Sequence, residues 1–218
     1  MEPTTLLRDA ILVVGAYLAG SIPMSVLVAR AIGGPDPRTI GSGRTGGTNA
    51  LRALGRGPAL LVVTGDLAKG AIPVLVARWM TGGDVTIEVL CGLAAVLGAW
   101  RSVFLGFHGG RGVATGVGTM LVIEPWAVVL AAPVFIGVVL VTRYVSLGSL
   151  LGSAALIPAM AILWLVADGQ LPPVYIAYTV AGVVLIWLAH ADNIDRLIHG
   201  QERRIDLGAF TGRSSGSG

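Results

Sequence analysis

Three clusters of glycine and polar residues could do chemistry in this sequence, and the first occupies residues 41–52. Glycine has no Cβ, so several backbone N–H groups can converge on one anion, here with Gly41 and Gly43 in the turn. The side chains add hydrogen-bond donors and a planar guanidinium suited to phosphate: Ser42, Thr48, Asn49 and Arg52. The pattern predicts a phosphate cradle.

Two other interpretations of this cluster stay open. Its composition also fits a flexible turn between two apolar segments. Gly41 and Gly46 have the spacing of a nucleotide-binding P-loop, but Gly47 occupies the position of the P-loop lysine and no predicted strand precedes the turn. We therefore do not expect ATP to bind here.

The second cluster, residues 108–115, opens directly into an apolar segment. Gly109, Gly110 and Gly112 leave the first backbone amides of a following helix free, and the positive end of the helix dipole then faces the loop. Arg111 adds a full positive charge. The cluster predicts a second anion-binding element, with a cationic membrane anchor on a glycine hinge as the alternative.

The third cluster, residues 190–202, follows the last apolar segment. If that segment continues as a helix, His190, Asn193 and Leu197 share one face because they are three and four residues apart. A histidine beside an amide at the end of a span predicts a polar site. The alternative is a solvated histidine that only caps the helix end.

Two acidic residues are expected to be structural. Glu202 should pair with a neighbouring arginine such as Arg196 or Arg203. Asp66 and Lys69, three apart in an apolar segment, should meet on one helical face that points to the protein interior, because charge at membrane depth costs a few kcal/mol. Lys69 could also line a polar cavity beneath the first cluster.

The elements that must position these clusters are membrane helices. The chain of 218 residues is 54% hydrophobic and only 12% charged, about half the charge of soluble proteins, with a mean hydropathy of +0.80. Charge-free runs such as residues 10–29, 144–167 and 169–191 approach the ~20 residues that cross a bilayer. This composition excludes a soluble protein.

We expect an all-α polytopic membrane protein with seven membrane helices. Five full spans are predicted, at residues 10–29, 58–77, 85–100, 144–167 and 171–190. Residues 112–142 are interrupted by Glu124-Pro125 into pieces of 12 and 18 residues, which predicts a re-entrant pair of half-crossing helices. Residues 21–23, Ser-Ile-Pro, predict a kink in the first span.

Charge sets the expected orientation. With this topology twelve arginines fall on one face of the membrane, and only Arg8 and Arg78 fall on the other. The positive-inside bias places the arginine-rich face in the cytoplasm, with the N-terminus outside and the C-terminus inside. The first span is too long for a cleaved signal peptide and is expected to be retained. We interpret the chain as one integral membrane domain, with residues 211–218 as a flexible tail.

Several classes of site are not expected. Cys91 is the single cysteine, so the chain can form neither an internal disulfide nor a cysteine-rich metal site. The loops of the arginine-rich face lack a carboxylate cluster, so neither a metal nor a cofactor is predicted. The arginines are scattered among short loops, which membrane topology explains better than nucleic-acid binding.

Taken in order, the clusters resemble the PlsY family of bacterial acyl-phosphate:glycerol-3-phosphate acyltransferases, from residues 20–23 through 66–70, 106–115 and 143–147 to the last cluster. The first family motif is similar to GSGNxGATNxxR and is matched by Ser42, Thr48, Asn49 and Arg52. The second is similar to GGKGVAT and is matched by Gly109, Gly110 and Gly112. The third is similar to HxxNxxRLxxGxE and is matched without exception from His190 to Glu202.

The sequence departs from the family pattern at five positions. Arg44 and Gly47 stand where the first motif has asparagine and alanine, and Arg111 stands where lysine is usual. Ala99 replaces a common histidine, and His108 replaces a common lysine. Arg111 keeps the positive charge but exchanges a mobile ammonium for a rigid fork, so the geometry of phosphate binding should change.

The resemblance implies transfer of a fatty acyl group from acyl phosphate to the sn-1 hydroxyl of glycerol 3-phosphate, giving lysophosphatidic acid. In this hypothesis Ser42, Arg52 and Arg111 hold phosphate, while His190 and Asn193 orient the hydroxyl for direct attack. Four further residues are expected to support the pocket: Lys69, Arg143, Ser146 and Glu202.

The expected partners are acyl phosphate, glycerol 3-phosphate and membrane lipid, with the protein acting as a monomer in the bacterial inner membrane and its site facing the cytoplasm. A transporter or channel for small phosphorylated anions is the alternative, because the same arginines and half-helices could serve it. A structural membrane scaffold is a third possibility. A CDP-alcohol phosphotransferase is not expected, because the sequence has no aspartate-rich metal motif.

Overall fold

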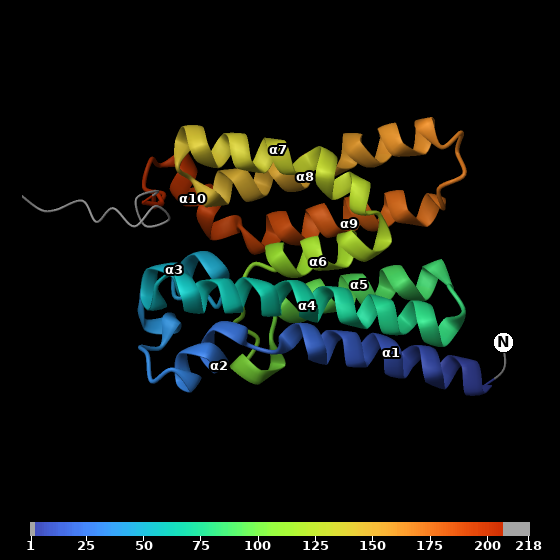
Figure 1. The fold of residues 1–218 in the computed structure, drawn as a ribbon, viewed down its shortest axis with the longest axis horizontal. Coiled ribbons are helices and arrows are strands. Elements are labelled where there is room, and N and C mark those ends of the chain that lie inside the picture. Colours follow the sequence, from blue (N-terminus) through green and yellow to red (C-terminus); the bar gives the residue numbers. More distant parts are fainter. Residues whose placement is uncertain (1–2, 207–218) are drawn as a thin grey trace, which may run out of the picture.

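The computed structural model describes residues 3–206, and its long helices run side by side along the long axis of the molecule (Figure 1). Every regular element in this part of the chain is helical. The all-α prediction is therefore confirmed for the described residues. The predicted flexible tail, residues 211–218, and Arg213 lie outside them.

The first predicted span is a bent pair, α1 (Pro3–Ser21) and α2 (Met24–Ala31). The two axes differ by 48° at Ile22-Pro23, which confirms the predicted kink. Proline cannot donate a backbone N–H, so the helical ladder breaks before it. A one-turn 3-10 helix, η1 (Pro37–Thr39), and a short helix, α3 (Gly47–Leu54), follow and carry the first cluster.

The next two spans form an antiparallel hairpin, α4 (Arg56–Thr81) and α5 (Val85–Trp100). Asp84 caps α5 by accepting hydrogen bonds from the backbone N–H groups of Thr86 and Ile87. The helix α1 packs along α5 at glycine contacts, since a Cβ on Gly98 would strike the carbonyl oxygen of Tyr17. A second one-turn helix, η2 (Val103–Leu105), leads from α5 towards the second cluster.

Residues 113–142 form the predicted hairpin, but its two arms are unequal. The first arm, α6 (Val113–Ile123), is short, whereas α7 (Pro125–Thr142) has the length and hydropathy of a full span. The prediction of two half-crossing helices is therefore wrong for α7. The break is where it was expected, because Glu124 caps α7 by accepting from the backbone N–H of Trp126 and Pro125 occupies the first helical position.

The last long helices are α8 (Val145–Val166) and α9 (Pro173–Ala189), and α10 (Ala191–Ile198) follows α9 after a bend of 62° at His190. The last span thus ends within one residue of its predicted end at His190, and the helix does not continue straight into the third cluster. The polar helix α10 instead turns away from the apolar axis of α9, because its charged residues cannot remain at membrane depth.

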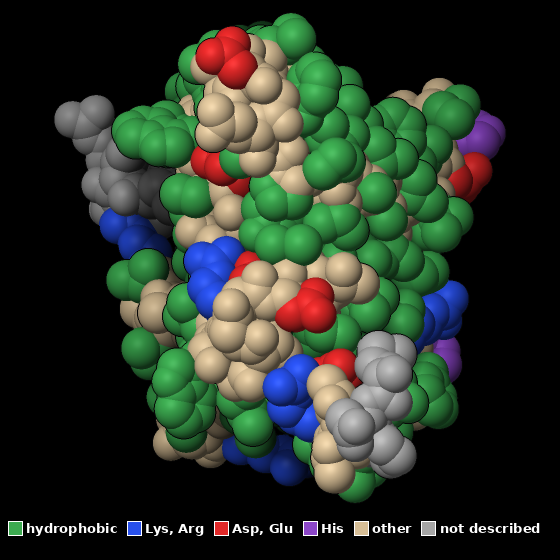
Figure 2. Space-filling model, turned by 90° about the vertical axis from the view of Figure 1, so that its right-hand side faces the viewer, with side chains coloured by type: hydrophobic (Ala, Val, Ile, Leu, Met, Phe, Trp, Pro, Cys, Tyr) green, Lys and Arg blue, Asp and Glu red, His purple; other side chains and the backbone are tan. Residues whose placement is uncertain are grey.

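The surface is that of a membrane protein. Among the described residues, four helices are long and apolar enough to cross a bilayer, or up to six if each bent pair counts as one span. Only 11% of the apolar window of α7 is buried inside the protein. Seen end-on, hydrophobic side chains cover the flanks around a few charged residues (Figure 2). Lipid must cover these flanks.

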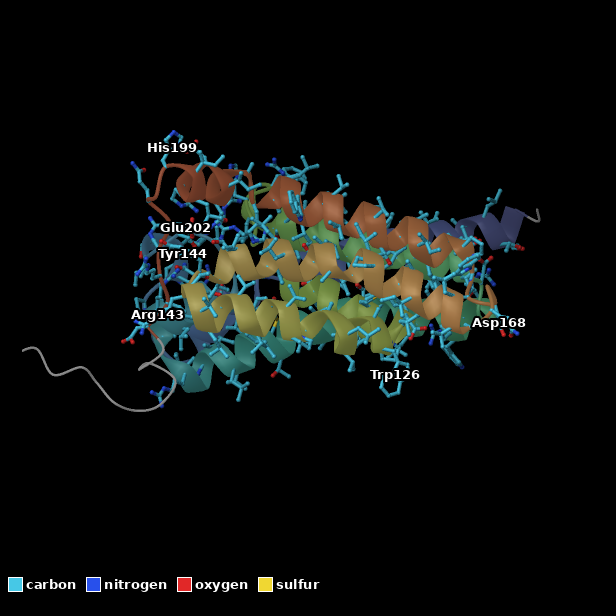
Figure 3. The ribbon with its side chains drawn as sticks, turned by 90° about the horizontal axis from the view of Figure 1, so that it is seen from above. Trp126, Arg143, Tyr144, Asp168, His199 and Glu202 are labelled. Atoms are coloured by element: carbon cyan, nitrogen blue, oxygen red, sulfur yellow. The ribbon has the colours of Figure 1, made fainter. Side chains whose placement is uncertain are left out.

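The two ends of the bundle differ in character. The start of α1 and the end of α4 lie at one end, where Arg8 donates a hydrogen bond to the carbonyl of Met80 (Figure 1). The helices α3 and α10 lie at the opposite end, together with Arg143 and His199 (Figures 1 and 3). All three polar clusters therefore gather at one end of the molecule.

We predict that Gly118→Ala destabilises the protein, because a Cβ there would collide with the backbone carbonyl of Leu67 and force α4 and α6 apart. Such overpacking costs about 2 kcal/mol of unfolding free energy. Thermal or denaturant unfolding in detergent measures the loss. Gly15→Ala, where a Cβ meets nothing within 4 Å, is the matched control. Equal effects of the two substitutions would contradict the close packing.

Candidate functional site

A cavity of about 590 Å³ extends from the end of the bundle that carries the clusters to the side of α6. Its polar wall is built from all three clusters: Ser42, Arg44, Thr48, Asn49, Arg52, Gly110, Arg111, Gly112, His190, Asn193 and Glu202. Its apolar wall comes from α6, α7, α8 and α9: Met120, Val128, Ala131, Phe135, Leu156 and Val183. The three clusters thus form one site, which continues into an apolar trough.

The first cluster is organised by the buried side chain of Asn49. Its Oδ1 accepts from the backbone N–H of Ser42 at 3.1 Å, and its Nδ2 donates to the carbonyl oxygens of Pro37 at 2.6 Å and Arg44 at 3.0 Å. Both N–H groups and the oxygen of the Asn49 amide therefore form hydrogen bonds within the loop. The prediction that Asn49 binds phosphate needs correction, because its amide holds the Ser42 turn in place.

Three predicted phosphate-binding glycines lie outside the cavity lining: Gly41, Gly43 and Gly109. Gly41 and Gly43 have φ values of +60° and +69°, which side chains with a Cβ rarely adopt. A Cβ on Gly109 would strike the carbonyl of Ala99. These glycines shape the loops, whereas Gly110 and Gly112 lie at the wall itself.

The N-terminus of α6 forms part of the wall. Its N-cap, Gly112, has a φ of +74°, and no side chain caps the first turn. The backbone N–H groups of that turn have no partner within the helix, so they can bind an anion, assisted by the helix dipole. This agrees with the anion-binding element that the second cluster predicts.

Asp192 joins the clusters to one another. Its Oδ2 lies 3.0 Å from a guanidinium nitrogen of Arg111 and 3.2 Å from one of Arg196, and its Oδ1 lies 3.9 Å from one of Arg44. The Nε of Arg111 is buried without a hydrogen-bond partner in residues 3–206. Burial lowers the pKa of Arg111, which nevertheless stays charged. Asp192 is not among the predicted site residues, although its spacing of four from Arg196 indicates an ion pair on one helical face.

His190 is buried, with 2% of its surface exposed. Its Nδ1 lies 2.8 Å from the carbonyl oxygen of Ile186, which can only accept, so the proton belongs on Nδ1. The Nε2 atom is then a hydrogen-bond acceptor in the cavity wall. Burial lowers the pKa of His190 to about 4, so the ring is neutral at pH 7.

Asn193 stands one helical turn further on. Its Nδ2 donates to Oε1 of Glu202 at 2.9 Å, while its Oδ1 is buried with no partner among the described residues. The other oxygen of Glu202 pairs with Arg196 at 3.0 Å, as predicted, and Arg203 is not its partner. Two acceptors, Nε2 of His190 and Oδ1 of Asn193, are therefore available to one hydroxyl donor.

Of the remaining residues that were predicted to support the pocket, two line the cavity and one does not. Lys69 lines the cavity, paired with Asp66 at 2.8 Å and donating to the carbonyl of Ile22 at 3.0 Å. Ser146 also lines it, and its buried hydroxyl has no partner in the described part of the chain. Arg143 does not line the cavity and is exposed at the end of α7, so the prediction of pocket support is wrong for its side chain.

Comparison with known proteins fits this geometry. Residues 10–200 match the family model described as glycerol-3-phosphate acyltransferase. The chain belongs to the glycerol-3-phosphate acyltransferase family. The likeness to this family that the motifs carry is thereby confirmed.

This chain is similar to individual members of the glycerol-3-phosphate acyltransferase family over almost their whole length. The member from Geobacter sulfurreducens is 43% identical over 91% of this chain and 98% of its own. One from Thermus thermophilus is 46% identical over 87% and 92%. A crystal structure of PlsY, an integral membrane glycerol 3-phosphate acyltransferase in its glycerol 3-phosphate form, superposes with a TM-score of 0.83 at 35% identity, over 94% of this chain and 100% of that one.

The positions that depart from the family motifs are not equally placed. Arg44, Gly47, Ala99 and Arg111 line the cavity. His108 does not, and its Nδ1 is engaged with the carbonyl of Gly106 at 2.7 Å. Of the departures that line the cavity, Arg44 adds a positive charge and Arg111 keeps one. Gly47 and Ala99 are small uncharged residues.

We predict that acid destabilises the wild-type protein partly through His190. Its pKa falls from 6.5 to about 4 on folding, so the unfolded chain binds the proton more readily and stability is lost as pH drops below 6.5. Lowering the pH from 7 to 5 should cost about 2 kcal/mol through this residue. His190→Asn should lose less than the wild type in thermal unfolding at the two pH values. Equal losses would refute the buried neutral ring.

Proposed function

We propose that this protein transfers a fatty acyl group from acyl phosphate to the sn-1 hydroxyl of glycerol 3-phosphate, giving lysophosphatidic acid and phosphate for phospholipid synthesis. One observation carries the proposal: a single cavity joins an arginine-rich polar wall to an apolar trough. Both substrates bear phosphate and one bears a long alkyl chain. The related PlsY is described in a glycerol 3-phosphate form and in a lysophosphatidic acid form, which supports the same assignment here.

The donor is proposed to be acyl phosphate because the site needs no acyl-enzyme intermediate. A covalent route needs an activated nucleophile. Within residues 3–206 no hydrogen bond joins Ser42 to His190, and Cys91 is buried outside the cavity lining. Acyl phosphate is already an activated mixed anhydride. The hydroxyl oxygen attacks the carbonyl carbon directly, the carbon–oxygen bond to phosphate breaks, and phosphate leaves with the bonding electrons.

The acceptor hydroxyl is positioned by the third cluster. It donates to Nε2 of His190 or to Oδ1 of Asn193, which both belong to residues that line the cavity and which have no hydrogen-bond partner within residues 3–206. A ring with a pKa near 4 is a weak base, so His190 chiefly aligns the hydroxyl, and the departing phosphate oxygen is a competent final proton acceptor. Alignment of two bound reactants accounts for much of the expected rate.

Phosphate is held by the other two clusters. Arg111 and the free amides of the first turn of α6 face the junction of the polar and apolar walls, where the phosphate of a chain-bearing donor must lie. Arg52 on α3 and the Ser42 hydroxyl in the preceding loop also bind phosphate. The asymmetric arginine distribution supports a location of this end of the bundle at the cytoplasmic face of the bacterial inner membrane. The protein acts there as a monomer.

Purified protein should form lysophosphatidic acid from acyl phosphate and glycerol 3-phosphate. Chromatography of the product measures this reaction. His190→Ala and Ser42→Ala should each lower kcat/KM at least a hundredfold, because each removes a group that contacts a reactant. Acyl thioesters should not replace acyl phosphate. Wild-type silence with acyl phosphate, or flux of glycerol 3-phosphate across sealed vesicles without product, would contradict the proposal.

The apolar trough should hold the acyl chain. Gly182 in α9 lines the cavity, and a Cβ added there meets nothing within 4 Å, so a larger side chain would project into open space. Gly182→Leu should lower activity with long-chain donors at least tenfold while short-chain donors lose little. Gly137→Leu is the matched control, since Gly137 is exposed on α7, outside the lining, with equal room for a Cβ. Loss of long-chain activity in both variants would reject this location.

A further inference from the structure

Three of the cations that line the cavity have an acidic partner. Arg44 and Arg111 share Asp192, and Lys69 pairs with Asp66. The remaining two, Arg52 and Arg203, line the cavity and form no ion pair within residues 3–206, although the negative charge of Glu202 acts on Arg52. Their guanidinium groups therefore have N–H donors available for an anion at the mouth of the cavity.

Arg203 is held in place by its chain neighbours. It belongs to residues 201–206, which we call the strap, and which follow α10 without regular structure. On one side of it, Glu202 is bonded to Asn193 and Arg196. The strap therefore begins on the third cluster, at the same end of the bundle as Arg143 and Tyr144 (Figure 3).

The other side of Arg203 is anchored to the junction of α7 and α8. The guanidinium of Arg204 lies 5.4 Å from the ring centre of Tyr144 and donates to its hydroxyl at 3.3 Å. The backbone N–H of Ile205 donates to the carbonyl of Arg143 at 2.8 Å, and the Ile205 side chain is buried. Fixed residues on both sides hold the intervening Arg203 at the cavity wall.

Arg52 approaches from the opposite side. It lies on α3, and its Cδ is 3.5 Å from the position that a Cβ on Gly41 would occupy, so its side chain runs along the Ser42 turn. Partial burial lowers the pKa of Arg52, the positive charge of Arg203 lowers it further, and the negative charge of Glu202 acts in the opposite direction. The two guanidinium groups are thus close enough to repel one another, and a dianion between them would relieve that repulsion.

We propose that Arg203 and Arg52 form a clamp that binds the phosphate of glycerol 3-phosphate at the mouth of the cavity. This inference rests on the proposed function and adds Arg203 as a substrate-binding residue. The acceptor is assigned here because both arginines are exposed, where a water-soluble substrate arrives, whereas Arg111 is buried beside the apolar trough. Two planar forks bind one phosphate with more hydrogen bonds than a single arginine provides.

The test compares steady-state kinetics of wild type, Arg203→Gln and Arg203→Lys. Arg203→Gln should raise the KM for glycerol 3-phosphate at least tenfold, with kcat and the KM for acyl phosphate changed less than twofold. Arg203→Lys should recover part of the loss, because it restores the charge but not the fork. Arg30→Gln, which removes an exposed arginine from α2 outside the cavity lining, should behave as wild type.

Binding without turnover separates this proposal from the proposed function. Calorimetric titration of glycerol 3-phosphate, with no acyl donor present, should show weaker binding for Arg52→Gln and for Arg203→Gln. The double variant should lose less than the product of the two losses, because both side chains hold the same anion. Glycerol 3-phosphate binding that depends on Arg203 in a protein that forms no product would keep the clamp and reject the enzyme.

Three results would overturn the clamp. The first is an Arg203→Gln variant with the wild-type dissociation constant for glycerol 3-phosphate. The second is a KM increase confined to acyl phosphate. The third is a loss that coincides with a lowered unfolding temperature and that Arg203→Lys fails to recover, since a structural role would produce that pattern.

Discussion

The Asp192 carboxylate lies within hydrogen-bond distance of Arg111 and Arg196 and 3.9 Å from Arg44. These arginines come from three loops or helices that are far apart in the sequence, and each would repel the others without a shared anion. Removing one partner from such a group leaves an uncompensated charge, which costs several kcal/mol when it is buried. The links among the three clusters therefore depend on Asp192, which neutralises part of the positive charge at this end of the bundle.

The short helix α6 supplies the second constraint. Because it begins inside the bundle, its first turn presents backbone amides at the cavity wall instead of at the membrane surface. The same shortness leaves room beside α7, α8 and α9 for an apolar trough. A charged group and a hydrocarbon chain can thus occupy one continuous space, each against a wall of its own polarity. Close glycine contacts between α4 and α6 keep the amides at a fixed depth.

Much of this arrangement could be predicted from the sequence, for reasons that particular residues make clear. Pro23 indicated the kink, Glu124-Pro125 indicated the hairpin, and Glu202 indicated its ion pair with Arg196, because each rests on local chemistry. The errors concern what local patterns do not encode. Asn49 carries the right donors for phosphate, yet the folded loop uses all of them. Arg143 lies outside the cavity, and α7 is longer than a half-span. The links from Asp192 to Arg44 and Arg111, and those of the strap to α7 and α8, join residues up to 148 positions apart, so no spacing rule could reveal them.

The order of the site along the chain has a consequence for biogenesis. Synthesis proceeds from the N-terminus, so Arg44 and Arg111 emerge and reach the membrane long before Asp192 exists. Every apolar helix can be inserted by then, yet the arginines still repel one another and Asn193 and Glu202 are absent. Competence therefore arrives with the last few residues of the described chain, after the bundle has been threaded, and a nascent or truncated polypeptide that stops at the end of α9 is a membrane protein without an assembled reaction centre.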